Sequence, residues 1–432
     1  MQVGSTQGAE RIYATTRARR KSFNASADAR ADLLLETHAP AWPISNTGRR
    51  AATLTAFSIE HLDKGFVALM ISGPKIVSTF SGCGGMDVGF HNVGFETIWA
   101  NEIQPDAAQT FRENIGNVVD PRDVREIDPF TDPTIPKGDL VIGGFPCQDF
   151  SRIWKQPGLD GSRGNYYKDF RNFVAAQKPR AFVAENVKGL LSANKRRAID
   201  TIVRDLESIE PGYLIKPRLY NFAEYGVPQF RERLLIVGIR KDTGFNFRHP
   251  KPTHGPGTEN PFMTSGQALR GVEEVPFNNE LPRMSQKTRE MLELIPEGKN
   301  YTSINEDSEY YVKGLISHVY RRLHRDEPSP TVIAGGGGGT WGYHFEEPRA
   351  LTNRERARLQ SFDDDFVFYG SKTEIRRQIG NAVPPRGVEA LATRLLPLFE
   401  DNYERVELES EIERLRALPI AERLKEANVE VD

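Results

Sequence analysis

Between residues 75 and 240, short apolar runs alternate with longer amphipathic stretches. Buried strands are expected at 75–80, 96–101, 139–142, 181–184 and 234–237. Strand-length apolar runs separated by helix-length segments are typical of repeated βαβ units, so the pattern predicts an α/β fold. Four of the five runs end beside unusual glycine, cysteine, acidic or arginine residues. In open α/β sheets the ligand crevice lies at the carboxyl ends of the strands, so a site is expected there.

The chain changes character after residue 241. Residues 241–330 have no regular helical or strand pattern and contain Pro250, Pro252, Pro256 and Pro261, which predicts a second, loop-rich domain. A glycine run at 335–339 is interpreted as a flexible connector. Helical spacing returns at 351–359 and 388–398.

Both ends of the chain differ from the middle. Residues 1–70 lack sustained apolar periodicity until about Phe66, which predicts a weakly ordered extension. A transit peptide and a true start at Met70 are two further interpretations that stay open. The tail at 400–432 has 11 acidic and 5 basic residues. It is expected to be one solvated, appended helix without catalytic content, with Val406, Ile412, Leu415 and Leu418 on one face.

Composition excludes several classes of protein. Hydrophobic residues make up 38% and charged residues 27% of the 432, a balance unlike that of a wholly disordered chain. No apolar run reaches the roughly 20 residues of a membrane span. The only two cysteines, Cys83 and Cys147, make a disulfide scaffold implausible and indicate a reducing, cytoplasmic compartment. The net charge is −2, with the acidic tail carrying −6, so any nucleic-acid surface must be local.

A glycine-rich cluster at 80–90 follows the first predicted strand and opens a helix. Glycines there let the backbone turn tightly and approach a ligand at the helix N-terminus. The spacing is not that of a dinucleotide loop, because position 87 is Asp. Glu102 follows about 20 residues later, where a carboxylate commonly accepts hydrogen bonds from ribose hydroxyls. Taken alone, the cluster is equally consistent with a structural turn.

Three further clusters carry reactive side chains. Cys147 lies in a polar, glycine-containing strand exit, the setting of an activated thiolate, although a lone cysteine is more often a small buried hydrophobe. Glu185 ends a buried strand and is either an ion-pair partner or a proton donor with a raised pKa. Arg231 and Arg233 share one face if extended, which suits carboxylate or phosphate contacts, or a surface salt-bridge pair.

The order of these clusters resembles that of the DNA (cytosine-5) methyltransferases of bacterial restriction-modification systems. Matching segments cover roughly three quarters of the chain, from Ile76 to about Val388. They are the glycine loop, Glu102, Asp123-Val124, Pro146-Cys147-Gln148, Glu185-Asn186-Val187, the segment 229–233, the segments 349–355 and 358–362, and the segment 378–385.

The resemblance implies a Rossmann-like domain that depends on S-adenosylmethionine, a smaller irregular target-recognition domain, and EC 2.1.1.37 activity on double-stranded DNA. Cys147 would add to C6 of a flipped cytosine, Glu185 would bind or protonate N3, and Arg233 would hold O2, with Arg231 also in the catalytic set. The cofactor contacts would be Phe80, Ser81, Gly82, Gly84, Gly85, Glu102, Asp123 and Asn381. The DNA contacts would be Gln148, Ser151, Gln229, Arg321, Arg322 and Arg325.

The implied organisation has five parts. They are an N-terminal extension (1–70), a catalytic and cofactor-binding domain (71–242), a target-recognition domain (243–348), a segment returning to the catalytic domain (349–399) and the acidic tail (400–432). The protein is expected to need no metal, to act as a monomer in the cytoplasm, associated with the nucleoid when bound, and to protect DNA from a cognate restriction endonuclease.

Other activities fit the motifs less well. An RNA cytosine-5 methyltransferase usually carries a Cys-Phe-Thr element, which is absent here, and the variable region is long. Methyltransferases of exocyclic amines use a loop without a nucleophilic thiol. A catalytically silent DNA-binding protein on the same fold is disfavoured by the intact Cys147, Glu185 and paired arginines.

Overall fold

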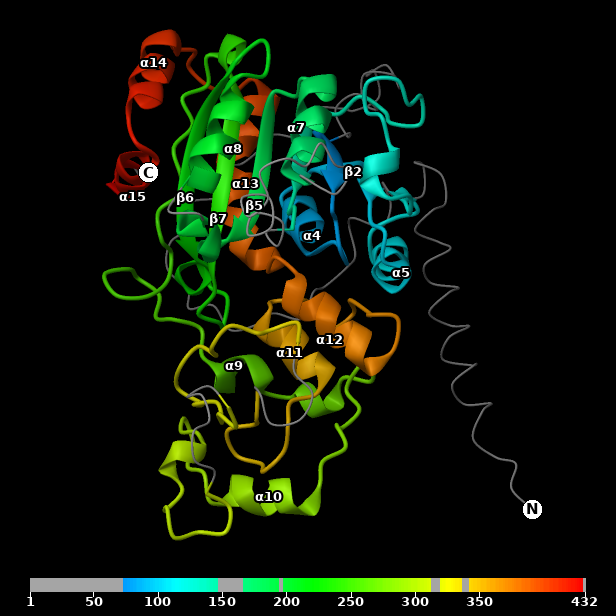
Figure 1. Ribbon diagram of the computed structural model, residues 1–432, viewed down its shortest axis with the longest axis vertical. Coiled ribbons are helices and arrows are strands. Elements are labelled where there is room, and N and C mark those ends of the chain that lie inside the picture. The colour runs from blue at the N-terminus through cyan, green and yellow to red at the C-terminus, as the bar shows by residue number, and fades with distance from the viewer. Residues whose placement is uncertain (1–72, 147–165, 194–196, 312–318, 336–341, 430–432) are drawn as a thin grey trace, which may run out of the picture. The chain divides into compact units, whose positions relative to one another are not determined.

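The computed structural model describes residues 73–146, 166–193, 197–311, 319–335 and 342–429. A seven-stranded sheet with the order β3-β2-β1-β4-β5-β7-β6 forms the centre (Figure 1). The five strands in the order β3-β2-β1-β4-β5 pair in parallel, whereas β7 runs antiparallel to both β5 and β6. The strands are β1 (Lys75–Thr79), β2 (Glu96–Asn101), β3 (Val119–Asp120), β4 (Leu140–Gly143), β5 (Ala181–Val187), β6 (Tyr213–Asn221) and β7 (Glu232–Arg240). The predicted α/β fold and its five predicted strands are confirmed, and β3 and β6 are additional.

Helices cover both faces of this sheet, which explains why its strands are apolar throughout. On one face, α4 (Gly85–His91) and α13 (Pro385–Glu400) pack against a core that includes Ile142 and Val237. On the other face, α7 (Tyr166–Gln177) and α8 (Arg197–Glu207) pack against residues that include Val141 and Ile236 (Figure 1). Because side chains alternate along a strand, neighbouring residues of β4 serve opposite cores.

Smaller elements lie between these strands and helices and in the region after β7. α5 (Pro105–Asn114) packs beside β2 and β3. Short 3-10 helices are η2 (Val124–Glu126), η4 (Lys188–Leu191), η6 (Phe222–Tyr225), η7 (Lys241–Thr243), η8 (Val272–Glu274) and η9 (Tyr301–Ser303).

Beyond β7 the described residues form no further strand of the sheet, as the irregular composition predicts. This region contains α9 (Ser265–Leu269) and α10 (Gln286–Glu293), followed by α11 (Asn353–Leu359) and α12 (Lys372–Asn381). α11 and α13 match the two segments with predicted helical spacing. The exact domain boundaries remain predictions.

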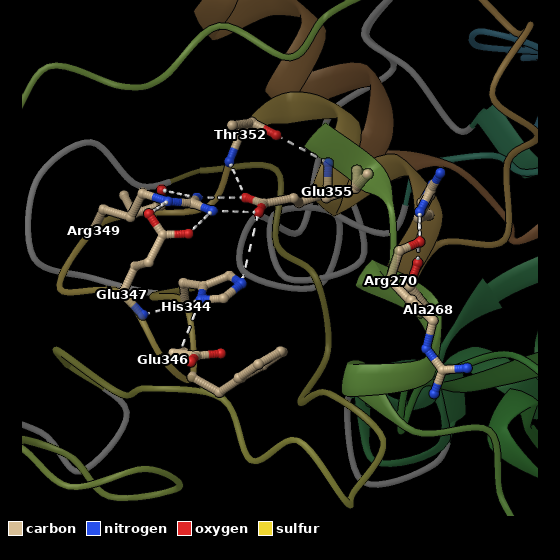
Figure 2. A network of polar contacts seen from close by, with 12 residues as sticks. Ala268, Arg270, His344, Glu346, Glu347, Arg349, Thr352 and Glu355 are labelled. Carbon is tan, nitrogen blue, oxygen red and sulfur yellow. Dashed lines mark hydrogen bonds and ion pairs between the residues drawn. The ribbon is translucent and has the colours of Figure 1, made fainter. Parts of the chain in front are cut away.

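A polar network anchors the start of α11 to the chain before it (Figure 2). The Thr352 hydroxyl and the Glu355 carboxylate form a reciprocal capping box. The Arg349 guanidinium donates to Glu355, 2.8 Å from Oε1, and to the exposed Glu347. Nε2 of His344 lies 3.9 Å from the same Glu355 oxygen. The buried Glu355 carboxylate is therefore fully engaged in holding this helix end.

The C-terminal tail corrects the prediction of one solvated helix. It forms two helices, α14 (Glu409–Ala417) and α15 (Ile420–Val429), which contact the edge strand β6. Ile412 and Leu415 are buried in the main core, whereas Val406 precedes α14 and is exposed. The tail thus covers a sheet edge that would otherwise present unpaired backbone groups.

Candidate active site

A cavity of about 790 Å³ opens at the carboxyl ends of the parallel strands. Its lining comes from the ends of β1, β2, β4 and β5, from the start of β7, and from the end of α12. The cavity lies within the size range of small-molecule sites. Many of the predicted site residues, separated by up to 300 positions in the chain, therefore meet around one space.

The glycine loop forms one wall. Gly82 and Gly84 have φ values of +57° and +91°, which residues with a side chain rarely adopt. A Cβ on Gly82 would meet no atom within 4 Å, so this backbone borders open space. A Cβ on Gly85 would lie 2.3 Å from the Val383 carbonyl oxygen, so the start of α4 packs directly on the segment after α12.

Glu102 joins the glycine loop to the end of β2. Its carboxylate accepts from the backbone N–H of Gly82 at 2.9 Å and from that of Gln104 at 2.7 Å. Burial raises the pKa of the Glu102 carboxyl, and these two hydrogen bonds act in the opposite direction. The result is a carboxylate acceptor held in a fixed position on the cavity wall.

Aromatic and acidic side chains form the adjoining wall. Phe80 packs edge-on against Tyr166, with 5.7 Å between ring centroids, and Arg125 lies over the Tyr166 ring. Asp123 caps η2 by accepting from the backbone N–H of Arg125 at 3.0 Å. All but Arg125 line the cavity. Tyr166 was not predicted, and the sequence signal for it was an aromatic residue in the first turn of the helix after the Cys147 loop.

Glu185 and Arg233 form an ion pair in the same cavity. Nε of Arg233 lies 2.9 Å from Oε1 of Glu185, and both side chains are largely buried. Burial raises the pKa of Glu185, and the charges of Arg233 and Arg231 oppose that rise. Burial also lowers the pKa of Arg233. The pair presents one carboxyl and one guanidinium side by side, which suits recognition of adjacent polar atoms on a planar base.

The chain leading to the predicted nucleophile ends at the cavity. Pro146 is the last described residue before Cys147 and lines the cavity. The Asn186 amide donates to the Phe145 carbonyl at 2.9 Å, which ties this segment to β5 next to Glu185. Cys147, Gln148 and Ser151 themselves lie outside the described residues.

Asn381 and Cys83 lie near the C-terminal end of α12. Asn381 is exposed and borders the cavity, whereas Cys83 is buried, with Sγ 3.9 Å from the Gln378 carbonyl oxygen. Burial, assisted by the Glu102 charge, raises the pKa of Cys83 to about 12. Cys83 is therefore a poor nucleophile at neutral pH and has a packing role.

Three predicted site residues point into the protein and need correction. Arg231 and Gln229 are fully buried and donate hydrogen bonds to backbone carbonyls. Arg322 donates to five carbonyl groups, including those of His344 and Ile295. These contacts argue against a catalytic role for Arg231 and against DNA contacts by the other two. Sequence could not reveal this, because residue type does not report burial.

The remaining two candidates for DNA contact are more accessible. Arg325 is exposed and pairs with Glu297, with 3.0 Å between Nε and Oε2, and Arg321 is partly buried. Within the described ranges, no cluster of three His, Cys, Asp or Glu side chains is arranged to hold a metal ion. None of the helices there is long and apolar enough to cross a membrane.

Comparison with known proteins identifies the family of the chain. Residues 74–396 match the family described as C-5 cytosine-specific DNA methylase. The chain is 61% identical over 354 residues to the Type II methyltransferase M.NgoFVII of Neisseria gonorrhoeae, covering 81% of this chain and 94% of the relative. It is 43% identical over 342 residues to the Type II methyltransferase M.BbvI of Brevibacillus brevis, covering 77% of this chain and 90% of the relative.

A solved structure supports the same fold. A DNA modification methyltransferase encoded within an Escherichia coli prophage superimposes with a TM-score of 0.59 at 23% identity, covering 76% of this chain and all of the other. The chain therefore belongs to the C-5 cytosine-specific DNA methylase family and is a DNA (cytosine-5-)-methyltransferase of the restriction-modification type.

Proposed function

We propose that this enzyme flips a target cytosine out of double-stranded DNA, attacks its C6 with Cys147, and methylates its C5. The observation that carries the proposal is the single cavity that holds both the Glu185–Arg233 pair and the glycine loop with Glu102. A base at the first group and a methyl donor at the second would be neighbours. Such juxtaposition removes much of the entropic cost of a two-substrate reaction.

The cavity fits S-adenosylmethionine, the methyl donor of this family. Glu102 would accept from the ribose hydroxyls, and Asp123 from the adenine amino group. Phe80 and Tyr166 supply aromatic surface, and Ser81 and the glycine-loop backbone would bind the methionine part near Asn381. Helix N-termini and left-handed glycines of this kind present N–H groups to a ligand. When bound, the cofactor supplies an electrophilic methyl group on its sulfonium.

Covalent catalysis would be shared among three side chains. The Cys147 thiolate adds to C6, which makes C5 nucleophilic, and Glu185 protonates or hydrogen-bonds N3 to offset the developing negative charge. Arg233 holds O2. After methyl transfer a base removes the C5 proton, and elimination breaks the sulfur–C6 bond and restores the thiolate. Burial raises the pKa of the Glu185 carboxyl, which favours a hydrogen-bonding or proton-donating role toward N3.

Flipping follows from the geometry of duplex DNA, because C6 cannot be reached in a stacked base pair. We propose that residues 243–348 read the sequence, with Arg321 and Arg325 among the contacts, and that the segment of Gln148 and Ser151 closes over the DNA. We further propose that the enzyme is a monomer and protects DNA from a cognate endonuclease. The proposal that the enzyme protects DNA rests on its Type II methyltransferase relatives.

Replacing Cys147 by alanine tests the nucleophile. We expect Cys147→Ala to abolish transfer of labelled methyl from S-adenosylmethionine to DNA while leaving DNA binding largely intact, because only the covalent step is lost. Nucleoside analysis of wild-type product should find the label in 5-methylcytosine. Cys83→Ala is the matched control and should retain activity. Near-normal turnover by Cys147→Ala, or label in adenine, would contradict the proposal.

A further inference from the structure

Arg231 joins two parts of the chain that are far apart in sequence. Its Nη1 donates to the Val332 carbonyl at 2.9 Å. Its Nη2 donates to the carbonyls of Gly380 and Ala382, at 2.8 and 2.9 Å. These last two residues flank Asn381, the proposed cofactor contact. One planar, fully buried guanidinium therefore fixes both peptide groups around Asn381 relative to the segment at 332.

The segment at 329–332 is attached to the start of β7 by further hydrogen bonds. Gln229 accepts from the Val332 N–H at 2.7 Å, and its amide donates to the Leu359 carbonyl at 3.0 Å. The N–H of Phe230 donates to the Ser329 carbonyl at 2.8 Å. This segment lies within the proposed target-recognition region, residues 243–348. Displacement of that region would therefore act directly on Arg231.

The other end of the connection is the base pocket. Arg233 lies two residues after Arg231 and pairs with Glu185. The segment after α12 is closely packed as well, since a Cβ on Gly380 would lie 2.2 Å from the Ala334 nitrogen. The packing of Gly380 on Ala334 leaves the Asn381 turn little room to move independently of the segment at 332–334. A well-packed junction with little free space transmits displacement instead of absorbing it.

We propose that Arg231 is a positioning residue that couples DNA binding to the cofactor site, by holding the segment at 332 and the Asn381 turn in one arrangement. The inference rests on the proposed roles of Asn381 and Arg233 and replaces the catalytic role predicted for Arg231. Lysine cannot reproduce the coupling, because its single ammonium has no planar fork to span carbonyls on opposite sides.

Arg354 offers a matched control. It is also fully buried, and its guanidinium also donates to three carbonyls, those of Phe277, Asp363 and Phe366, at 3.1, 2.9 and 2.8 Å. None of these residues lines the cavity. Arg231→Lys and Arg354→Lys therefore remove similar buried contacts, but only the first touches the Asn381 turn.

The test measures equilibrium binding of radiolabelled S-adenosylhomocysteine with and without DNA that the wild-type enzyme methylates. We expect DNA to tighten binding to the wild type. In Arg231→Lys we expect a Kd higher by about tenfold and little remaining effect of DNA, from loss of one or two charge-assisted hydrogen bonds. Arg354→Lys should lower the unfolding temperature comparably, yet keep the Kd and the DNA effect within about twofold of wild type.

Three results would overturn the inference: no effect of DNA on the wild-type Kd, an unchanged Kd and DNA effect in Arg231→Lys, or the same loss in both variants. If Arg231→Lys does not fold, amide hydrogen exchange of the wild type tests the inference instead. DNA binding must then slow the exchange of the backbone amides at 380–383, and unchanged exchange there would overturn the coupling. Wild-type methyl transfer to cytosine is measured in the same preparation. Its absence would refute the proposed function, whereas its presence with any of the three results refutes only the coupling.

Discussion

Asp87 is a buried carboxylate on α4 that the proposed chemistry does not use. Its two oxygens accept from the Ser78 hydroxyl at 3.1 Å and the Thr97 hydroxyl at 2.9 Å. Burial raises its pKa to about 6, from 3.8, against the effect of these hydrogen bonds. Because the folded pKa lies above the unfolded value, the stabilising contribution is complete below about pH 4 and is lost as pH rises through 6.

Asp87→Asn should remove this pH dependence, because an amide of the same shape keeps one acceptor and carries no charge. Relative to that of the wild type, the free energy of unfolding of the variant should increase by up to about 3 kcal/mol between pH 4 and pH 7, because only the wild type loses stability over this range. Denaturant titrations of both proteins across this range provide the measurement. His91 also has its pKa lowered by burial. It is present in both proteins, so its contribution to the pH dependence of the free energy of unfolding cancels in the comparison. A difference that stays constant with pH would show that Asp87 is not buried as a charged group.

At the scale of elements, three of the predicted strands match the structure almost to the residue. β2 is predicted to the residue, and β1 and β4 to within one residue at each end. β5 and β7 extend further than predicted, because polar residues such as Glu185 and Arg233 continue the pairing at the site edge. The sequence also predicted that a ligand crevice lies at the carboxyl ends of the strands, and many of the residues that line the cavity lie there.

β6 was missed because it contains Lys216, Pro217 and Arg218, which interrupt the apolar run. The tail supplies partners for both charges: Lys216 Nζ lies 3.7 Å from Glu411 Oε1, and Arg218 Nε donates to Asn428 at 3.3 Å. Proline is tolerated at a sheet edge. No local pattern could reveal partners that lie about 200 residues away, and the burial of Arg231 escaped prediction for the same reason.

The tail helices therefore contribute to stability, which a pair of substitutions can measure. Leu415→Ala should lower the free energy of unfolding by about 2–4 kcal/mol, because it leaves a cavity in the main core. Val406→Ala, at an exposed position, should change it by less than about 0.5 kcal/mol. Chemical denaturation distinguishes the two. Equal, small effects would mean that α14 does not pack on the sheet in solution.

At the scale of the whole molecule, charge is distributed by region. The acidic tail lies on the β6 edge, and none of its described residues, 400–429, lines the cavity among the strands at the centre of the sheet. Residues 74–399 are nearly neutral, so a DNA-binding surface there depends on local arrangement, as with the exposed Arg325. Binding should still weaken with salt, because phosphate contacts release counterions.

Removal of residues 1–69 tests how much of the chain the enzyme needs. The family match begins at residue 74 and the first described strand at Lys75, so a chain starting at Met70 retains all the described elements that line the cavity. We expect its kcat and KM for methyl transfer to stay within about twofold of the full chain, as for changes that touch no site residue. A chain starting at Phe80 is the matched control. It lacks β1, which pairs with both β2 and β4, and should not fold. Loss of activity or of thermal stability in the Met70 chain would show that the N-terminal residues pack against the enzyme or contribute to its site.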